Sequence, residues 1–115
     1  MKKSPVTTTK PAAVAAEEVK SLRQAAEQGD SEARLKLGNA YRLGEGVDKD
    51  LTEAAKWFRL AAEQGHAEAQ FHLGQGYYFS EGVKKDLTEG VKWFRLAEEK
   101  YRFFKKMSRD GMKRY

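Results

Sequence analysis

Two histidines are the first residues in this chain that could do chemistry, because histidine binds metals and transfers protons near neutral pH. His66 and His72 lie six positions apart, whereas two metal ligands on one helix face need a spacing of three or four. We interpret both as surface histidines and predict no metal site. The chain has no cysteine, which excludes disulfides, thiolate metal sites and cysteine nucleophiles.

Two acidic pairs have a spacing that could suit general acid and base catalysis. Asp50 with Glu53, and Asp86 with Glu89, also have the spacing of a helix capping box. Capping explains both the spacing and the recurrence, and a single active site needs no duplicate. Residues 44–46, Gly-Glu-Gly, lack the third glycine and the preceding strand of a nucleotide-binding loop. The sequence therefore predicts a protein that is not an enzyme and has no cofactor.

The acidic pairs recur because the chain contains a duplication with a period of 36 residues. Across residues 23–64, 26 of the 42 residues are identical to the residue 36 positions later, which is too many for a shared polarity pattern alone. At 115 residues and 40% apolar content, the chain can form one domain with a modest core. A helical repeat of this length is typical of a stacked solenoid.

The elements that position these residues are predicted to be helices throughout. Both prolines occur by residue 11, and the rest is rich in residues that lose little freedom in a helix. The predicted fold class is all-α, built of stacked helix pairs. The expected organisation is a flexible tail (1–12), a half repeat (13–29), repeat one (30–65), repeat two (66–101), an extension of the last helix to 108, and a basic tail (109–115).

Apolar residues in the first helix of repeat one recur at spacings of three and four, which predicts a buried stripe. This stripe consists of Ala33, Leu37, Ala40 or Tyr41, and Gly44. Gly38 costs a helix about 1 kcal/mol relative to alanine, so its recurrence as Gly74 indicates that the paired helix approaches closely there. Val47 is expected to fill the core from the loop, and Trp57 and Trp93 are expected to be core residues.

The last helix is predicted to continue past the end of its repeat. Tyr101 replaces the Gly65 that would stop it, so we expect a helix from Asp86 or Leu87 to about Ser108. The face that continues comprises Ala97, Tyr101, Phe104 and Met107 or Ser108. An atypical last helix of this kind is typical of an end cap on a repeat array.

The spacing of residues 33–65 resembles the Sel-1-like repeat, a relative of the tetratricopeptide repeat. The matching pattern is Ala-x-x-x-Leu-Gly-x-x-Tyr-x-x-Gly-x-Gly-Val-x-x-Asp-x-x-Glu-Ala-x-x-Trp-x-x-x-Ala-Ala-x-x-Gly. The resemblance covers about residues 14–101, and the departures are Ser80, Gly90 and Tyr101. It implies a right-handed alpha-alpha superhelix whose concave surface binds a protein or peptide, as in adaptors and scaffolds.

Carried over by position, the resemblance implies a groove lined by the first helix of each repeat. Its residues would be Leu35, Asn39, Arg42, Leu43, Phe71, Gln75, Tyr78 and Phe79. They lie off the predicted core stripe, and the aromatic ones exceed what one core face needs. The other interpretation is that some of them pack against the next helix.

The charge of the chain is distributed unevenly, and the excess of positive charge at residues 100–115 suggests a second function. The net charge is +5, but residues 100–115 carry seven cations and one carboxylate, which leaves the body mildly acidic. The basic patch would consist of Lys100, Arg102, Lys105, Lys106 and Arg109. It is either the solvated face of a capping helix or, together with Phe103, Phe104 and Met107, a site for nucleic acid, an acidic partner or an anionic membrane.

The sequence also bears on location and assembly. No run approaches the ~20 apolar residues of a membrane helix, and the start of the chain lacks the ~7 to 15 apolar residues of a secretory signal. We expect a cytoplasmic protein, or a periplasmic or secreted one if a signal sequence was removed. A stack of about two and a half repeats is near the minimum that buries its own ends, so self-association is expected as one way to cover them.

Overall fold

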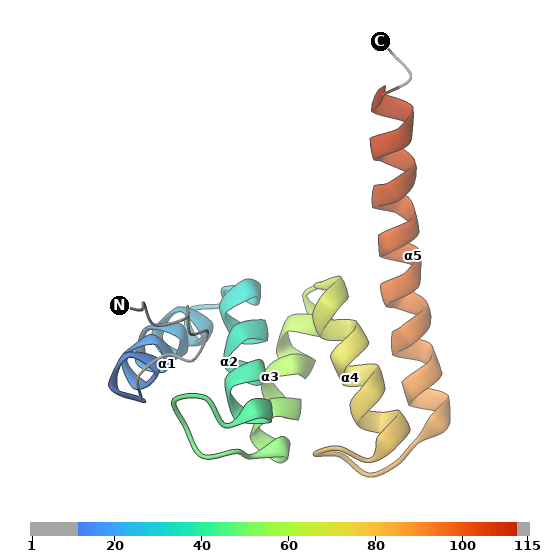
Figure 1. Cartoon of the computed structure of the whole chain (residues 1–115). Coiled ribbons are helices and arrows are strands. Elements are labelled where there is room, and N and C mark those ends of the chain that lie inside the picture. The colour runs from blue at the N-terminus through green and yellow to red at the C-terminus, as the bar shows by residue number, and fades with distance from the viewer. Residues whose placement is uncertain (1–11, 113–115) are drawn as a thin grey trace, which may run out of the picture.

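The computed structural model of the chain describes residues 12–112 and the side chains of residues 15–109. The helices are α1 (Ala12–Glu27), α2 (Ser31–Leu43), α3 (Leu51–Glu63), α4 (Ala67–Phe79) and α5 (Leu87–Met112). Consecutive helices from α2 to α5 run in alternating directions, and no strand occurs within residues 12–112 (Figure 1). The predicted all-α class is confirmed. The expected flexible tail, residues 1–12, lies outside the described residues except for Ala12.

The acidic pairs are helix caps, but only half of each predicted capping box forms. Asp50 Oδ1 accepts a hydrogen bond from the Glu53 backbone N–H at 3.1 Å. The Asp50 N–H donates instead to the carbonyl oxygen of Tyr41 at 2.9 Å, so it is not available to Glu53. Glu53 pairs with Lys56 at 3.0 Å. In repeat two the same contacts are made by Asp86, Glu89, Tyr77 and Lys92.

The two helical glycines mark the closest approach within each helix pair, as predicted. A Cβ atom on Gly38 would lie 2.6 Å from the ring of Phe58 on α3. A Cβ on Gly74 would lie 2.7 Å from the ring of Phe94 on α5 and 3.1 Å from the carbonyl oxygen of Gly90. In both repeats a phenylalanine ring therefore rests on bare helix backbone.

The core lies between successive helices in two connected clusters. One comprises Val19, Ala26, Ala33, Leu37 and Ala40, with Val47 and Trp57 packed against it. The other comprises Leu35, Ala54, Phe58, Ala61, Ala62, Ala69, Leu73 and Trp93. The predicted stripe and the loop plug Val47 are confirmed except for Gly44, which is exposed and ends α2 with φ +72°. Ser80 takes the same left-handed conformation at the end of α4, with φ +59°.

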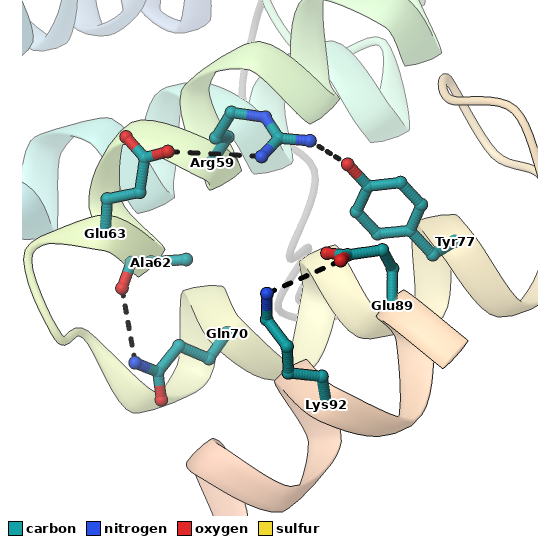
Figure 2. Close-up of polar contacts among 7 residues, drawn as sticks. All are labelled: Arg59, Ala62, Glu63, Gln70, Tyr77, Glu89 and Lys92. Atoms are coloured by element: carbon teal, nitrogen blue, oxygen red, sulfur yellow. Dashed lines mark hydrogen bonds and ion pairs between the residues drawn. The ribbon is translucent and has the colours of Figure 1, made fainter. Parts of the chain in front are cut away.

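Successive repeats are joined by contacts that recur at the same positions. Arg59 on α3 donates a hydrogen bond to the Tyr77 hydroxyl, and its guanidinium lies 5.5 Å from the ring centroid (Figure 2). Gln70 Nε2 donates to the carbonyl oxygen of Ala62 at 3.2 Å, near the end of α3 (Figure 2). One repeat earlier, the equivalent contacts join Arg23 to Tyr41 and Arg34 to Ala26. The duplication thus repeats the joints between units as well as the units.

The last helix is longer than predicted, and its end does not cap the core. α5 continues to Met112 rather than ending near Ser108. Residues 101–109 are all exposed, including Tyr101 and Phe104, which were expected on a covering face. The reason is that α5 is longer than the body on which it packs. Lys100 Nζ already donates to the carbonyl oxygen of Gly65 in the α3–α4 turn, so later residues extend past the body (Figure 1).

Candidate partner-binding surface

The eight predicted groove residues occupy equivalent positions on α2 and α4, but the structure divides them. Leu35 is only 3% exposed and belongs to the core cluster between α2, α3 and α4. This corrects the prediction that Leu35 lines a groove. The alternative interpretation, packing against a neighbouring helix, holds for this residue.

Three of the predicted residues lie together beside a small crevice of about 10 Å³. Asn39 Oδ1 accepts a hydrogen bond from the Arg42 guanidinium at 3.4 Å. Arg42 and Gln75 both line the crevice, which is formed where α2, α3 and α4 meet. Its other lining residues are Leu51, Ala54, Ala55, Phe58, His72, Leu73, Gly76 and Glu81. Asn39, Arg42 and Gln75 are half-buried.

His72 joins this group, contrary to its interpretation as a surface histidine. Its ring stacks on Phe58 of α3, with centroids 4.8 Å apart and planes 17° apart. Burial and the nearby Arg42 guanidinium lower the pKa of His72 below its usual 6.5, against smaller opposing effects of Gln75 and Glu68. The side chain is therefore a neutral, polar ring at neutral pH. We name Asn39, Arg42, His72 and Gln75 the polar strip.

His66 also has a structural role rather than a free surface position. Its Nδ1 accepts a hydrogen bond from the Ala69 N–H, which caps the start of α4. Its Nε2 lies 2.8 Å from a Glu32 carboxylate oxygen. Among residues 12–112, no group of three or more metal-binding side chains comes together.

The aromatic groove candidates gather around Phe94 instead of around the polar strip. The Phe71 and Tyr78 rings lie 5.5 Å and 6.1 Å from the Phe94 ring, which rests on Gly74. Phe71 is 46% exposed, whereas Leu35, its equivalent in repeat one, is covered. The exposure of Phe71 thus reflects its place in the last repeat, where no further helix pair packs on it.

Leu43 and Phe79, the remaining two candidates, are exposed at the ends of α2 and α4, at 52% and 60%. Phe79 packs edge-on against Tyr78, with ring centroids 5.0 Å apart. The two side chains provide apolar surface at equivalent ends of the two first helices.

Sequence reasoning missed His72 and Phe94, although a signal for Phe94 was present. In both repeats a phenylalanine follows the helical glycine by 20 positions, as Gly38 with Phe58 and Gly74 with Phe94. A side chain that must rest on a glycine recurs with that glycine. His72 gave no such signal, because its equivalent in repeat one is Lys36.

The predicted basic patch also divides. Lys100 is tied to the α3–α4 turn by its bond to the Gly65 carbonyl oxygen. Arg102, Lys105, Lys106 and Arg109 are exposed on the part of α5 that extends past the body. In the described part of the chain, no helix is long and apolar enough to cross a bilayer.

Helix pairs that stack through repeated joints, with accessible side chains on the first helix of each pair, define a helical-repeat solenoid. The Sel1 repeat profile matches residues 22–30, 31–66 and 67–100, which is well over half of the chain. The chain therefore belongs to the Sel1 repeat family, whose members are commonly protein-interaction modules. A search of curated proteins found no match.

Solved structures share this fold. A protective antigen from uropathogenic Escherichia coli strains, described as displaying an SLR fold, is 39% identical with a TM-score of 0.73, over 74% of this chain and 18% of that one. A Sel1 repeat protein from Oxalobacter formigenes is 40% identical with a TM-score of 0.69, over 70% and 33%. Helicobacter pylori cysteine rich protein B is 30% identical with a TM-score of 0.68, over 70% and 61%. The matched region thus spans less than two thirds of each of these chains.

Proposed function

We propose that this chain is a non-catalytic interaction module that binds a protein or peptide segment at the polar strip. The observation that carries the proposal is the convergence of Arg42 of one repeat with His72 and Gln75 of the next beside one crevice. The helix joints do not require these side chains to meet there. Family membership supports the general role, since Sel1 repeat proteins generally bind other proteins.

The chemistry of the strip indicates the kind of segment that fits. Arg42 and the Gln75 amide offer hydrogen-bond donors to carboxylate and backbone carbonyl oxygens. Exposed Leu43 and Phe79 lie at the ends of the same two helices and suit apolar side chains. The expected ligand is an extended or helical segment with an acidic or amide group beside an apolar residue.

A displayed library of random 12-residue peptides tests this proposal without knowledge of the natural partner. Peptides that bind the parent chain should bind Arg42→Ala/Gln75→Ala at least about tenfold more weakly, which corresponds to about 1.4 kcal/mol. Lys56→Ala, on the second helix of repeat one, is the matched control and should bind like the parent. Raising salt from about 50 to about 200 mM should change this affinity far less than it changes phosphate binding.

Two results would count against this site. One is a library that yields no enriched peptide, and the other is full binding by the Arg42→Ala/Gln75→Ala variant. Phe71 and Tyr78 are less suitable positions for the test. They pack around Phe94, so truncating them would change the α4–α5 packing as well as any binding surface.

A further inference from the structure

The part of α5 that extends past the body, residues 101–109, is amphipathic. We call it the α5 extension. Its apolar stripe is formed by Tyr101, Phe103, Phe104 and Met107, which are 53–68% exposed. Its cationic face is formed by Arg102, Lys105, Lys106 and Arg109, and the extension holds no carboxylate. Each set recurs at spacings of three and four, so the two sets occupy opposite sides of the helix.

The direction of the apolar stripe follows from the helix register. Gly90 and Ala97 are buried where α5 packs on α4, and Tyr101 and Phe104 continue that side at spacings of four and three. The stripe therefore faces the space directly beyond the α3–α4 turn, along the line of α4. α5 and this turn form a corner that is open in the single chain (Figure 1).

The shape of this corner selects among occupants. A flat membrane cannot lie along the stripe, because α4 and the α3–α4 turn project from α5 on the same side. Nucleic acid would engage the cationic face and leave the aromatic stripe in water. A helix placed beyond α4 fills the corner and covers the stripe.

The charges at the corner match those of the extension itself. Glu63, at the end of α3, and Glu68, in the first turn of α4, carry exposed carboxylates beside the turn. Glu63 lies 4.0 Å from the Arg59 guanidinium, so its carboxylate has one partner already (Figure 2). The Lys100 ammonium is bonded to the Gly65 carbonyl oxygen of the same turn. The cationic face of a second α5 extension, arriving tip first, would bring Lys106 and Arg109 to these carboxylates. The negative end of that helix would also meet the positive start of α4.

We propose that two copies of this chain form a symmetric dimer in which their α5 extensions pack antiparallel, apolar stripe against apolar stripe. Each extension ends against the α3–α4 turn of the other copy, and the two bodies lie at opposite ends. A parallel arrangement is excluded because both bodies would then lie at the same end of the paired helices. Each body projects on the side of its own apolar stripe, so the two would collide. The dimer leaves the polar strip free, so it is independent of the proposed peptide binding.

The size of the contact predicts a weak dimer. Three aromatic side chains of roughly 150–250 Å² each, about three fifths exposed, offer roughly 300–450 Å² per copy before Met107 and the turn are added. Stable interfaces begin at roughly 600 Å² per partner. Dissociation in the micromolar range is expected.

Sedimentation velocity of the full chain between about 2 and about 200 μM tests the proposal. The chain should shift from its monomer mass of 13.1 kDa to twice that value as the concentration rises. Phe103→Ser/Phe104→Ser should stay monomeric, with an unchanged circular dichroism spectrum because both rings are exposed. Leu87→Ser/Val91→Ser, which removes exposed apolar surface from another side of α5, should dimerise like the parent.

Charge reversal tests the orientation. Glu63→Lys/Glu68→Lys and Lys106→Glu/Arg109→Glu should each dimerise at least about tenfold more weakly than the parent, and an equal mixture of the two should regain dimers. A parent chain that stays monomeric at every concentration would overturn the proposal. Binding of that monomer to phosphatidylserine vesicles or to duplex DNA would not rescue it. So would dissociation by Leu87→Ser/Val91→Ser with no effect of the Phe103/Phe104 variant, or a mixture that stays monomeric.

Discussion

At the scale of single residues, His72 shows how one side chain can serve both packing and a surface. Its ring covers Phe58, the side chain that rests on Gly38, and its edge borders the crevice. A lysine at this position, as in repeat one at Lys36, would not stack in the same way. The core of repeat one therefore depends on a residue from repeat two.

The lowered pKa of His72 predicts a loss of stability in mild acid. The unfolded side chain takes up a proton near pH 6.5, while the folded one resists it, so the unfolded state binds more protons below that pH. The contribution of His72 is complete above pH 6.5 and decreases as the pH falls toward the folded pKa. Each unit by which the pKa of the folded state differs from that of the unfolded state changes the free energy of unfolding by about 1.4 kcal/mol.

Urea unfolding at pH 7.5, 6.5 and 5.5 measures this effect. His72→Phe keeps the stacked ring but cannot be protonated, so its free energy of unfolding should decrease less than that of the parent between pH 7.5 and 5.5. Leu43→Ala, which changes an exposed side chain and no titratable group, is the matched control and should follow the parent. Equal decreases in the parent and in His72→Phe would show that this ring is not the titrating group.

At the scale of elements, the pairing of α4 with α5 depends on two glycines that face each other. Gly74 accommodates the Phe94 ring, and Gly90 lies against the backbone of α4. In the α2–α3 pair the second position is Ala54. The last pair therefore has less side-chain volume between its backbones than the pair before it.

Substitution of Gly74 tests this pairing. Gly74→Leu should abolish cooperative unfolding, because its side chain would collide with Phe94 and with the Gly90 carbonyl. Gly74→Ala gains about 1 kcal/mol in helix propensity, but overpacking costs about 1–3 kcal/mol, so a net loss of stability is expected. Gln75→Ala should stay within about 0.5 kcal/mol of the parent. Thermal melting followed by circular dichroism gives all three values, and a Gly74→Leu variant that melts like the parent would refute this helix pairing.

At the scale of the whole molecule, the second helix of repeat one and the second helix of repeat two have different surroundings. The positions that α4 covers in repeat one, such as Ala62, are buried, whereas the equivalent Glu98 in α5 is exposed and pairs with Arg102 at 3.1 Å. A carboxylate there suits a solvent-facing last helix rather than a further buried layer. In the part of the chain that the structure describes, the packed body therefore ends at about Lys100.

Removal of residues 101–115 tests whether the body stands without the α5 extension. At about 2 μM, where the proposed dimer dissociates, the truncated chain should melt within about 2 °C of the parent, because the side chains of residues 101–109 are all exposed. Its circular dichroism per residue should still be that of a helical protein. A decrease of more than about 8 °C would instead support the original interpretation of this segment as a cap.

Much of the architecture was predictable because it rests on local rules that the duplication states twice. The capping aspartates Asp50 and Asp86, the helical glycines and the alanine-rich stripes each act within a few residues or at a helical spacing. Their physics is therefore visible in one dimension. The family pattern adds the order of the helices, and the structure confirms it.

The surface assignments depended on which neighbour covers each position, and only the tertiary structure decides that. Leu35 and Phe71 have equivalent places in the repeat, yet Leu35 is buried and Phe71 is 46% exposed. The difference arises because the next helix pair, α4 with α5, packs on repeat one and covers Leu35, whereas no described helix pair packs on repeat two in the same way. In the same way, an apolar face on residues 101–109 implied a cap, but the body ends level with Lys100. Periodicity along a chain determines which sides of a helix are apolar, while the packing of other helices determines which of those sides meets water.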